Sequence, residues 1–157
     1  GHAIVRIPLV WGPGVRGNFR ALLSLAASGV PLPFAAIDNR RSLVHVEDAA
    51  DALALAATHP EAAGHAWSAA PADPVSTPGL VAAIRAAMAM PPRLFAFPAG
   101  LLEAAARLAG RGGQVLRLTR SLEADGLPLR QALGWRPTRS LEDDLAQTVD
   151  AWRRERR

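Results

Sequence analysis

The first ten residues constrain the fold most, because they hold an almost unbroken run of branched apolar side chains. Residues 3–10 read AIVRIPLV. A short apolar run of this kind is typical of a strand that is buried on both faces of a parallel sheet. Pro8 has no N–H to donate to a neighbouring strand, so we expect the strand to end there or to reach a sheet edge.

The rest of the chain alternates between strand-like and helix-like segments, which indicates an α/β fold. About four short strands and about six helices are predicted, which is few strands for a doubly wound sheet. Asn18 is expected to cap the first helix. The predicted strands are 3–10, 42–46, 64–69 and 94–97, and the predicted helices are 19–28, 47–58, 77–90, 98–109, 128–133 and a last one that opens at Ser140.

The composition narrows the chemistry that this chain can perform. The 157 residues include no Cys and no Tyr, and all 18 basic residues are Arg. Disulfides, thiol nucleophiles, cysteine zinc sites and lysine Schiff bases are therefore excluded. The sequence pI of about 11.3 reflects the lack of groups that titrate between neutral pH and the arginine range. The net charge is only +4, most of it in the tail 152–157. We expect no nucleic-acid partner, no membrane partner and a cytoplasmic location.

A glycine-rich turn after the first strand has two interpretations. Gly12–Gly17 satisfies G-x-G-x-x-G between a predicted strand and a predicted helix, and Asp38 lies roughly where a ribose-binding acid is expected. On that interpretation the chain is a stand-alone dinucleotide or nucleotide-sugar binding module. Pro13 removes an N–H from the loop and Pro8 interrupts the strand, which favours a plain turn between strand and helix.

Three sequence blocks, in order, resemble one known family. Residues 6–14 (RIPLVWGPG) are similar to its R-x-P-x-V-Y-G-P-G segment, and residues 41–52 (RSLVHVEDAADA) to its R-S/D-x-V-H-V-x-D-x-A-x-A segment. Residues 133–152 are similar to its closing L-G-W-x-P, S-L-E-E-G-L and T-V-x-W elements. The family is the extended short-chain dehydrogenases/reductases, within it the NAD-dependent epimerases/dehydratases of the UDP-glucose 4-epimerase type. Trp11 replaces the usual Tyr, and residues 125–128 (DGLP) replace D-x-S-K.

The resemblance implies the C-terminal portion of an NAD(P)-binding Rossmann-like enzyme. Residues 1–157 then form a single substrate-binding unit, and the NAD-binding half with its Tyr and Lys catalytic pair is absent. The chain alone has no catalytic residue and is expected to be inactive. NAD is the cofactor of the parent enzyme and is not expected to bind tightly here. The expected partner is a nucleotide sugar such as a UDP-hexose. The open first strand predicts self-association, and an interaction domain without a ligand remains an alternative.

Site residues follow from the resemblance position by position. Pro8, Leu9 and Val10 match the segment whose backbone lies against the nicotinamide. Arg41 matches an arginine that pairs with the substrate diphosphate, for which a guanidinium is suited. The other proposed substrate residues are Asn18, Phe34 in the stretch along the uracil, and Arg117, with Arg120 as the alternative to Arg117.

The histidines and Asp48 have simpler structural explanations. His45 lies in a short predicted strand and Asp48 in the first turn of a helix, where a carboxylate is favoured by the dipole. The four histidines have no ligand spacing, so we expect no metal site.

Overall fold

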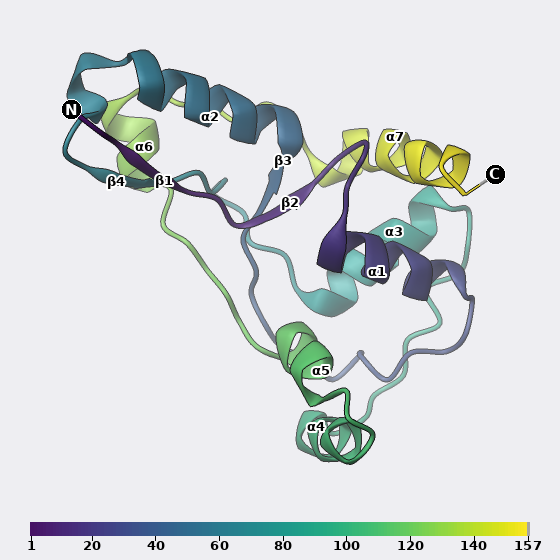
Figure 1. Cartoon of the computed structure of the whole chain (residues 1–157). Coiled ribbons are helices and arrows are strands. Elements are labelled where there is room, and N and C mark those ends of the chain that lie inside the picture. Colours follow the sequence, from purple (N-terminus) through teal and green to yellow (C-terminus); the bar gives the residue numbers. More distant parts are fainter. Residues whose placement is uncertain (157) are drawn as a thin grey trace.

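The computed structural model describes residues 1–156, which form two small parallel sheets and seven α-helices (Figure 1). The α/β prediction is confirmed, with one helix more than expected. The strands are β1 (Ile4–Arg6), β2 (Leu9–Trp11), β3 (Leu43–His45) and β4 (Ala66–Ser68). The helices are α1 (Gly17–Ala27), α2 (Val46–Thr58), α3 (Thr77–Ala87), α4 (Ala99–Leu108), α5 (Gly112–Thr119), α6 (Leu127–Ala132) and α7 (Leu141–Arg154), with a 3-10 turn, η1, at Pro60–Ala62.

Pro8 divides the first apolar run into two strands that join different sheets. β1 pairs in parallel with β4, with Val5 opposite Trp67, and β2 pairs in parallel with β3, with Val10 opposite Val44. The prediction of one strand over 3–10 is therefore wrong in its length but right about its end, because proline cannot supply a ladder hydrogen bond.

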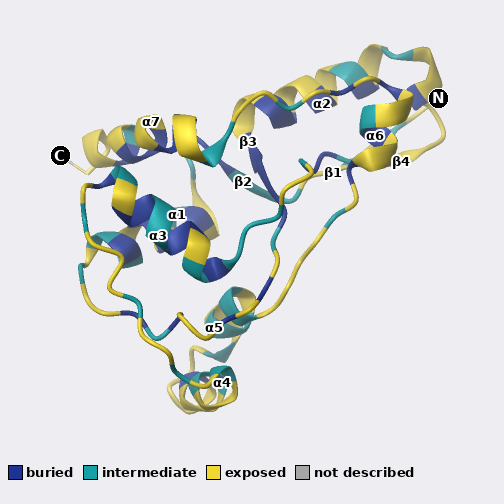
Figure 2. Ribbon diagram, turned by 180° about the vertical axis from the view of Figure 1, so that it is seen from behind, coloured by how far each residue is buried: buried dark blue, intermediate teal, exposed yellow. Residues whose placement is uncertain are grey.

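Two hydrophobic cores lie on opposite faces of the β2–β3 sheet. The first joins one face of the β2–β3 sheet to α1, α3 and α7, and Phe19, Leu23 and Val81 are completely buried in it. The second joins the other face and the β1–β4 sheet to α2 and α6. Figure 2 shows the buried residues of α1, α2 and α3 on their inward sides. These helices bury one stripe each, as amphipathic helices do.

Helices α4 and α5 form a hairpin that projects from the two cores (Figure 1). They pack mainly against each other. α5 was not predicted, because it starts with Gly112 and Gly113, which are poor helix formers, and no residue of α5 itself is buried. The predicted strand 94–97 is also wrong: within the described chain this stretch makes only an isolated bridge from Leu94 to Leu32.

The predicted helix starts are partly confirmed. Ser140 caps α7, since its Oγ accepts the N–H of Asp143 at 3.2 Å. Asn18 does not cap α1. The helix begins at Gly17, one residue before Asn18, and the N-cap residue Arg16 contributes no side-chain hydrogen bond there. Asn18 thus stands in the first turn, and its side chain is available to another element.

Within the segment 125–128, Gly126 is required for a steric reason. A Cβ added to Gly126 would run into the backbone of Ala70, directly after β4. The absence of a side chain lets α6 begin against that sheet, and the Asp125 carboxylate accepts the N–H of Leu127 at 2.9 Å.

Over residues 1–156, no helix is both long and apolar enough to span a bilayer.

Candidate functional site

Two cavities open on the same face of the β2–β3 sheet. We name the larger, of about 330 Å³, the arginine pocket, and the smaller, of about 210 Å³, the Trp11 pocket. The arginine pocket is lined by Leu9, Asn18, Ala21, Leu22, Leu25, Arg41, Thr77, Leu80, Gln114, Arg117 and Leu118. The Trp11 pocket is lined by Trp11, Leu43, His45, Pro71, Asp73, Val75, Arg139, Ser140, Leu141 and Glu142.

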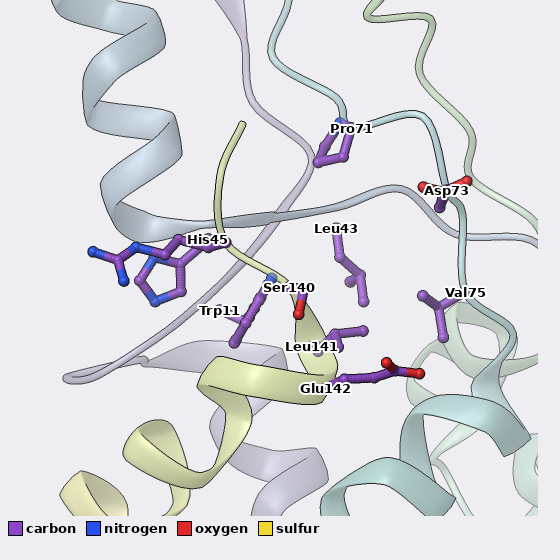
Figure 3. A pocket seen from close by; sticks show the side chains of 10 residues that line it. Trp11, Leu43, His45, Pro71, Asp73, Val75, Ser140, Leu141 and Glu142 are labelled. Atoms are coloured by element: carbon purple, nitrogen blue, oxygen red, sulfur yellow. The ribbon is translucent and has the colours of Figure 1, made fainter. Parts of the chain in front are cut away.

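The polar groups on one side of the Trp11 pocket already form interactions that stabilise the fold. Figure 3 shows Trp11, His45 and Ser140 on that side and the carboxylates of Asp73 and Glu142 on the other. His45 Nδ1 accepts the N–H of Glu47 at 3.3 Å and so caps α2. The His45 ring also meets Trp11 edge-on, with centroids 4.7 Å apart.

Arg139, at the same pocket, is equally occupied. It forms ion pairs with Glu47 and Asp144, and the Glu47 carboxylate raises the pKa of its guanidinium. The Trp11 pocket therefore offers few free groups for a ligand.

The arginine pocket has an apolar wall and a cationic rim. Six of its lining side chains are leucine or alanine, from β2, α1, α3 and α5. The rim contains Asn18, Arg41, Gln114 and Arg117. Among its described lining residues there is no Asp or Glu, so the two arginines have no countercharge from the wall. Such a site is complementary to an anion.

Arg41 is held in place by pairing on both sides of its backbone. Arg41 and Val75 exchange two backbone hydrogen bonds, of 3.0 and 2.9 Å. On the other side, Leu122 donates to Arg40 and accepts from Ser42. The Arg41 side chain is half-buried and donates to the carbonyl of Arg117. Its removal from water lowers the pKa of the guanidinium, since burial disfavours the charged form.

Arg117 brings α5 to the start of α1. Its Nη1 donates to Asn18 Oδ1 at 3.3 Å, across 99 residues of sequence. Both side chains are exposed, so a ligand can reach them. Arg120 does not line the pocket, and its backbone carbonyl instead accepts a hydrogen bond from Asn39. Of the two arginines that the sequence left open, the geometry favours Arg117.

The remaining proposed residues lie at different distances from this pocket. Leu9 lines it, whereas the Val10 side chain packs on the opposite face, in the core with α2. Pro8 is half-buried at the break between β1 and β2. Phe34 is 4% exposed and packs in the core with α1 and α3, outside the pocket lining. Any contact of Phe34 with a base must therefore be made by its backbone.

Asp48 has the structural role that the sequence suggested. It is 1% exposed, and its carboxylate accepts the backbone N–H groups of Thr138 and Arg139 at 2.9 and 3.1 Å. It thus ties α2 to the loop before α7. In the described part of the chain, no three His, Asp or Glu side chains gather as metal ligands would.

The Gly12–Gly17 turn is built for packing. A Cβ at Gly12 would lie 2.7 Å from Val46 and 3.0 Å from His45, so this glycine allows a close approach to the start of α2. A Cβ at Gly17 would meet no described atom within 4 Å. In a dinucleotide-binding turn the last glycine permits close packing of helix on strand. The structure thus favours a plain turn.

Some residues of the site were missed from the sequence, Gln114 and Asn39 among them. Gln114 lines the rim, but it lies in the unpredicted helix α5. Asn39 is buried beneath the site and holds it together, and its sequence neighbours give no sign of this. Its partners lie in α3 and at the end of α5, so only the tertiary structure reveals them.

The parallel strands and the anion-complementary pocket define an α/β protein with a candidate anion site, and comparisons with known proteins add to this description. Residues 2–70 match the profile of the NAD dependent epimerase/dehydratase family. Over 150 residues the chain is 33% identical to UDP-glucose 4-epimerase from Vibrio cholerae, covering 95% of this chain and 46% of that protein. Both matches make the chain similar to the NAD-dependent epimerase/dehydratase family, in agreement with the resemblance of the sequence blocks.

Solved structures show the same fold. UDP-glucuronic acid 4-epimerase from Bacillus cereus, in complex with UDP-glucuronic acid and NAD, aligns with a TM-score of 0.70 at 16% identity, over 98% of this chain and 45% of that one. UDP-glucose 4-epimerase from Thermus thermophilus, in complex with NAD, aligns with a TM-score of 0.67 at 23% identity, over 95% and 45%. The chain spans about half the length of these relatives.

Proposed function

We propose that this chain is the nucleotide-sugar binding part of an NAD-dependent epimerase/dehydratase, and that the arginine pocket receives the diphosphate of the substrate. The observation that carries the proposal is the convergence of Asn18, Arg41 and Arg117. These three residues come from separate segments, and all three line one cavity. The family resemblance predicted each of them, with Arg120 as the alternative to Arg117.

The charge distribution supports a diphosphate. Arg41 and Arg117 both line the pocket, and the described lining contains no carboxylate to neutralise them. A guanidinium binds phosphate oxygens through paired N–H groups, and it keeps its charge at any physiological pH. Asn18 adds an amide that can donate to a further oxygen once Arg117 turns to the ligand. The leucines behind the rim would face the less polar part of the substrate.

The cofactor would meet this chain at the carboxyl end of β1. Ligands of parallel sheets bind beyond the carboxyl ends of the strands, and Pro8–Val10 follows β1 directly, beside the parallel strand β4. These residues fit a contact with one end of NAD through their backbone. Bound NAD supplies the hydride chemistry of the complete enzyme.

In the proposed parent enzyme this chain binds and orients the substrate. The sequence contains no Tyr, and its basic residues are all Arg, so a Tyr and Lys pair for proton transfer has to come from another part of the protein. Turnover is therefore expected only when that part is present. A location in the cytoplasm remains an expectation.

Titration calorimetry with UDP and UDP-glucose tests the proposal. Arg41→Ala is expected to weaken UDP binding by at least about tenfold, or about 1.4 kcal/mol. The matched control is Arg40→Ala, one residue away, whose guanidinium lies on the surface 3.1 Å from Glu123. It should change the affinity by less than about twofold, since exposed ion pairs contribute little.

The contrary outcomes are clear. Absence of UDP binding by the unaltered chain, or equal losses in both variants, would contradict a diphosphate site. Tight NAD binding that Gly14→Val abolishes would instead support the dinucleotide-turn interpretation. Interconversion of UDP-glucose and UDP-galactose by this chain with added NAD would contradict the assignment of a binding role only.

A further inference from the structure

A buried asparagine lies directly beneath the arginine pocket. Asn39 is 2% exposed. Its Oδ1 accepts the backbone N–H of Thr77 at 2.8 Å, and its Nδ2 lies 3.1 Å from each of Thr77 Oγ1, Leu118 O and Arg120 O. Only one orientation of the amide suits these neighbours, because the side facing the N–H must be oxygen and the side facing two carbonyls must be nitrogen.

These partners connect the two segments that carry the arginines. Asn39 precedes Arg41 by two residues, and Leu118 directly follows Arg117. Thr77 Oγ1 also donates to Leu118 O, at 2.7 Å, so the first turn of α3 shares the same network. One side chain thus joins the Arg41 segment, α3 and the end of α5.

Apart from this network, α5 is joined to the rest of the molecule by Leu118, which packs on the first core, and by Leu122, which follows the helix and pairs with Arg40 and Ser42. Within the described chain it contributes no buried residue, and its main packing partner is α4, which projects with it. The contacts of Arg117 with Asn18 and with Arg41 lie at the exposed rim. A buried network of neutral hydrogen bonds is stronger and better defined in geometry than such exposed contacts.

We propose that Asn39 is a positioning residue that sets the separation of the Arg41 and Arg117 guanidinium groups, and that it thereby gives the pocket its preference for a diphosphate over a monophosphate. The inference rests on the proposed function of the pocket. Two phosphate groups can engage both arginines only at the correct spacing, whereas a single phosphate can be bound by either one. Loss of the spacing therefore lowers affinity for a diphosphate more than for a monophosphate.

The test is the ratio of the UMP to the UDP dissociation constants, measured by calorimetry on the full 157-residue chain. The unaltered chain should bind UDP at least about tenfold more tightly than UMP, equivalent to about 1.4 kcal/mol. In Asn39→Ala this ratio should fall to within about threefold, with UMP affinity nearly unchanged. A purely structural role would lower the folded fraction and weaken both ligands alike.

The control is Asp48→Asn. Asp48 is equally buried and also joins two segments, but it lies outside both pockets. It should lower thermal stability and leave the ratio unchanged. If Asn39→Ala does not fold, Thr77→Val decides, because it removes one shared hydroxyl of the network and keeps the volume; it should lower the ratio by a smaller amount.

The outcomes separate the two proposals. If Asn39→Ala folds and keeps the UMP-to-UDP ratio of the unaltered chain, the positioning role is overturned and the diphosphate site stands. If Asn39→Ala does not fold, the same result with folded Thr77→Val has the same meaning. Failure of the unaltered chain to bind UDP would overturn the proposed function, and the positioning role with it.

Discussion

At the scale of single residues, Arg85 is a fully buried charged side chain whose N–H groups all require hydrogen-bond acceptors. It is completely buried in α3, and its guanidinium donates to the backbone carbonyls of Ala26, Val30, Pro92 and Arg93. Burial, and to a smaller extent the charge of Arg93, lowers its pKa. Arg85 thus satisfies a carbonyl in the last turn of α1 and carbonyls of the connections that follow α1 and α3.

Replacement of Arg85 should therefore destabilise the fold strongly. Arg85→Met has a similar length but leaves those carbonyls without donors, which we expect to cost about 2–4 kcal/mol. Chemical denaturation measures the change. The control is Arg111→Ala at an exposed position before α5, which should stay within about 0.5 kcal/mol. Equal stability of the two variants would show that the buried charge is dispensable.

Replacement of glycine by alanine should have opposite effects on stability at two positions. Gly126→Ala forces a methyl group into the backbone of Ala70 and should cost about 3 kcal/mol or prevent folding. Gly113→Ala lies in α5, where a Cβ meets no described atom within 4 Å, and should stabilise by about 0.5–1 kcal/mol because alanine favours helix. Thermal denaturation of both variants measures the difference. A loss of stability in Gly113→Ala would indicate strain that the structure does not show.

Arg41 and Leu9 lie within recognisable sequence blocks, and the structure places both at the same pocket. Asn18 and Arg117 lie outside these blocks, were expected from the overall resemblance, and line the pocket as well. Asn39 could not be predicted, because its hydrogen-bond partners are 38 to 81 residues away in the sequence. Whether the proposed residues bind substrate remains a prediction.

At the scale of elements, the helices with one apolar stripe were easiest to predict. α2, α3 and α7 appear near their expected bounds, because periodicity, caps and proline at the first turn agree. The predicted end of α3 at Met90 is wrong, since the chain leaves the helix at Ala87 and Ala89 takes a φ of +57°. α5 begins with two glycines and has no side-chain cap, so the sequence carried no signal for the start of this helix.

α4 has two apolar faces, and only one is covered. Leu102 packs toward the first core, while Leu101 and Leu108 are 60% and 93% exposed. The double variant Leu101→Gln/Leu108→Gln should change the free energy of unfolding by less than about 0.5 kcal/mol. Leu102→Gln, in the same helix, should lose about 1–2 kcal/mol, since a polar group replaces a packed leucine. Urea titrations compare them, and equal effects would mean that the outer face is also buried.

At the scale of the whole molecule, the open edge of β1 is the feature that most favours self-association. β1 pairs with β4 on one side, and Ile4 and Ile7 beside the free edge are 52% and 38% exposed. Unpaired strand edges with apolar side chains recruit further strands. We therefore expect this chain to self-associate as its concentration rises.

Light scattering over a concentration series checks this expectation. Ile4→Lys should reduce the apparent mass at high concentration, because a charge at a strand edge opposes pairing. Val30→Lys, at an equally exposed loop position, should leave it unchanged. A monomer at every concentration would contradict the association, and equal effects of the two substitutions would assign it to net charge rather than to the strand.

The pairing of Arg41 between Val75 and Leu122 has a kinetic consequence. This short segment is flanked by partners that follow it by 34 and 81 residues, so neither flank exists until long loops have closed. Loop closure over such distances slows folding. We therefore expect the segment that carries Arg41 to be completed late in folding, so that ligand affinity depends on complete folding of the chain.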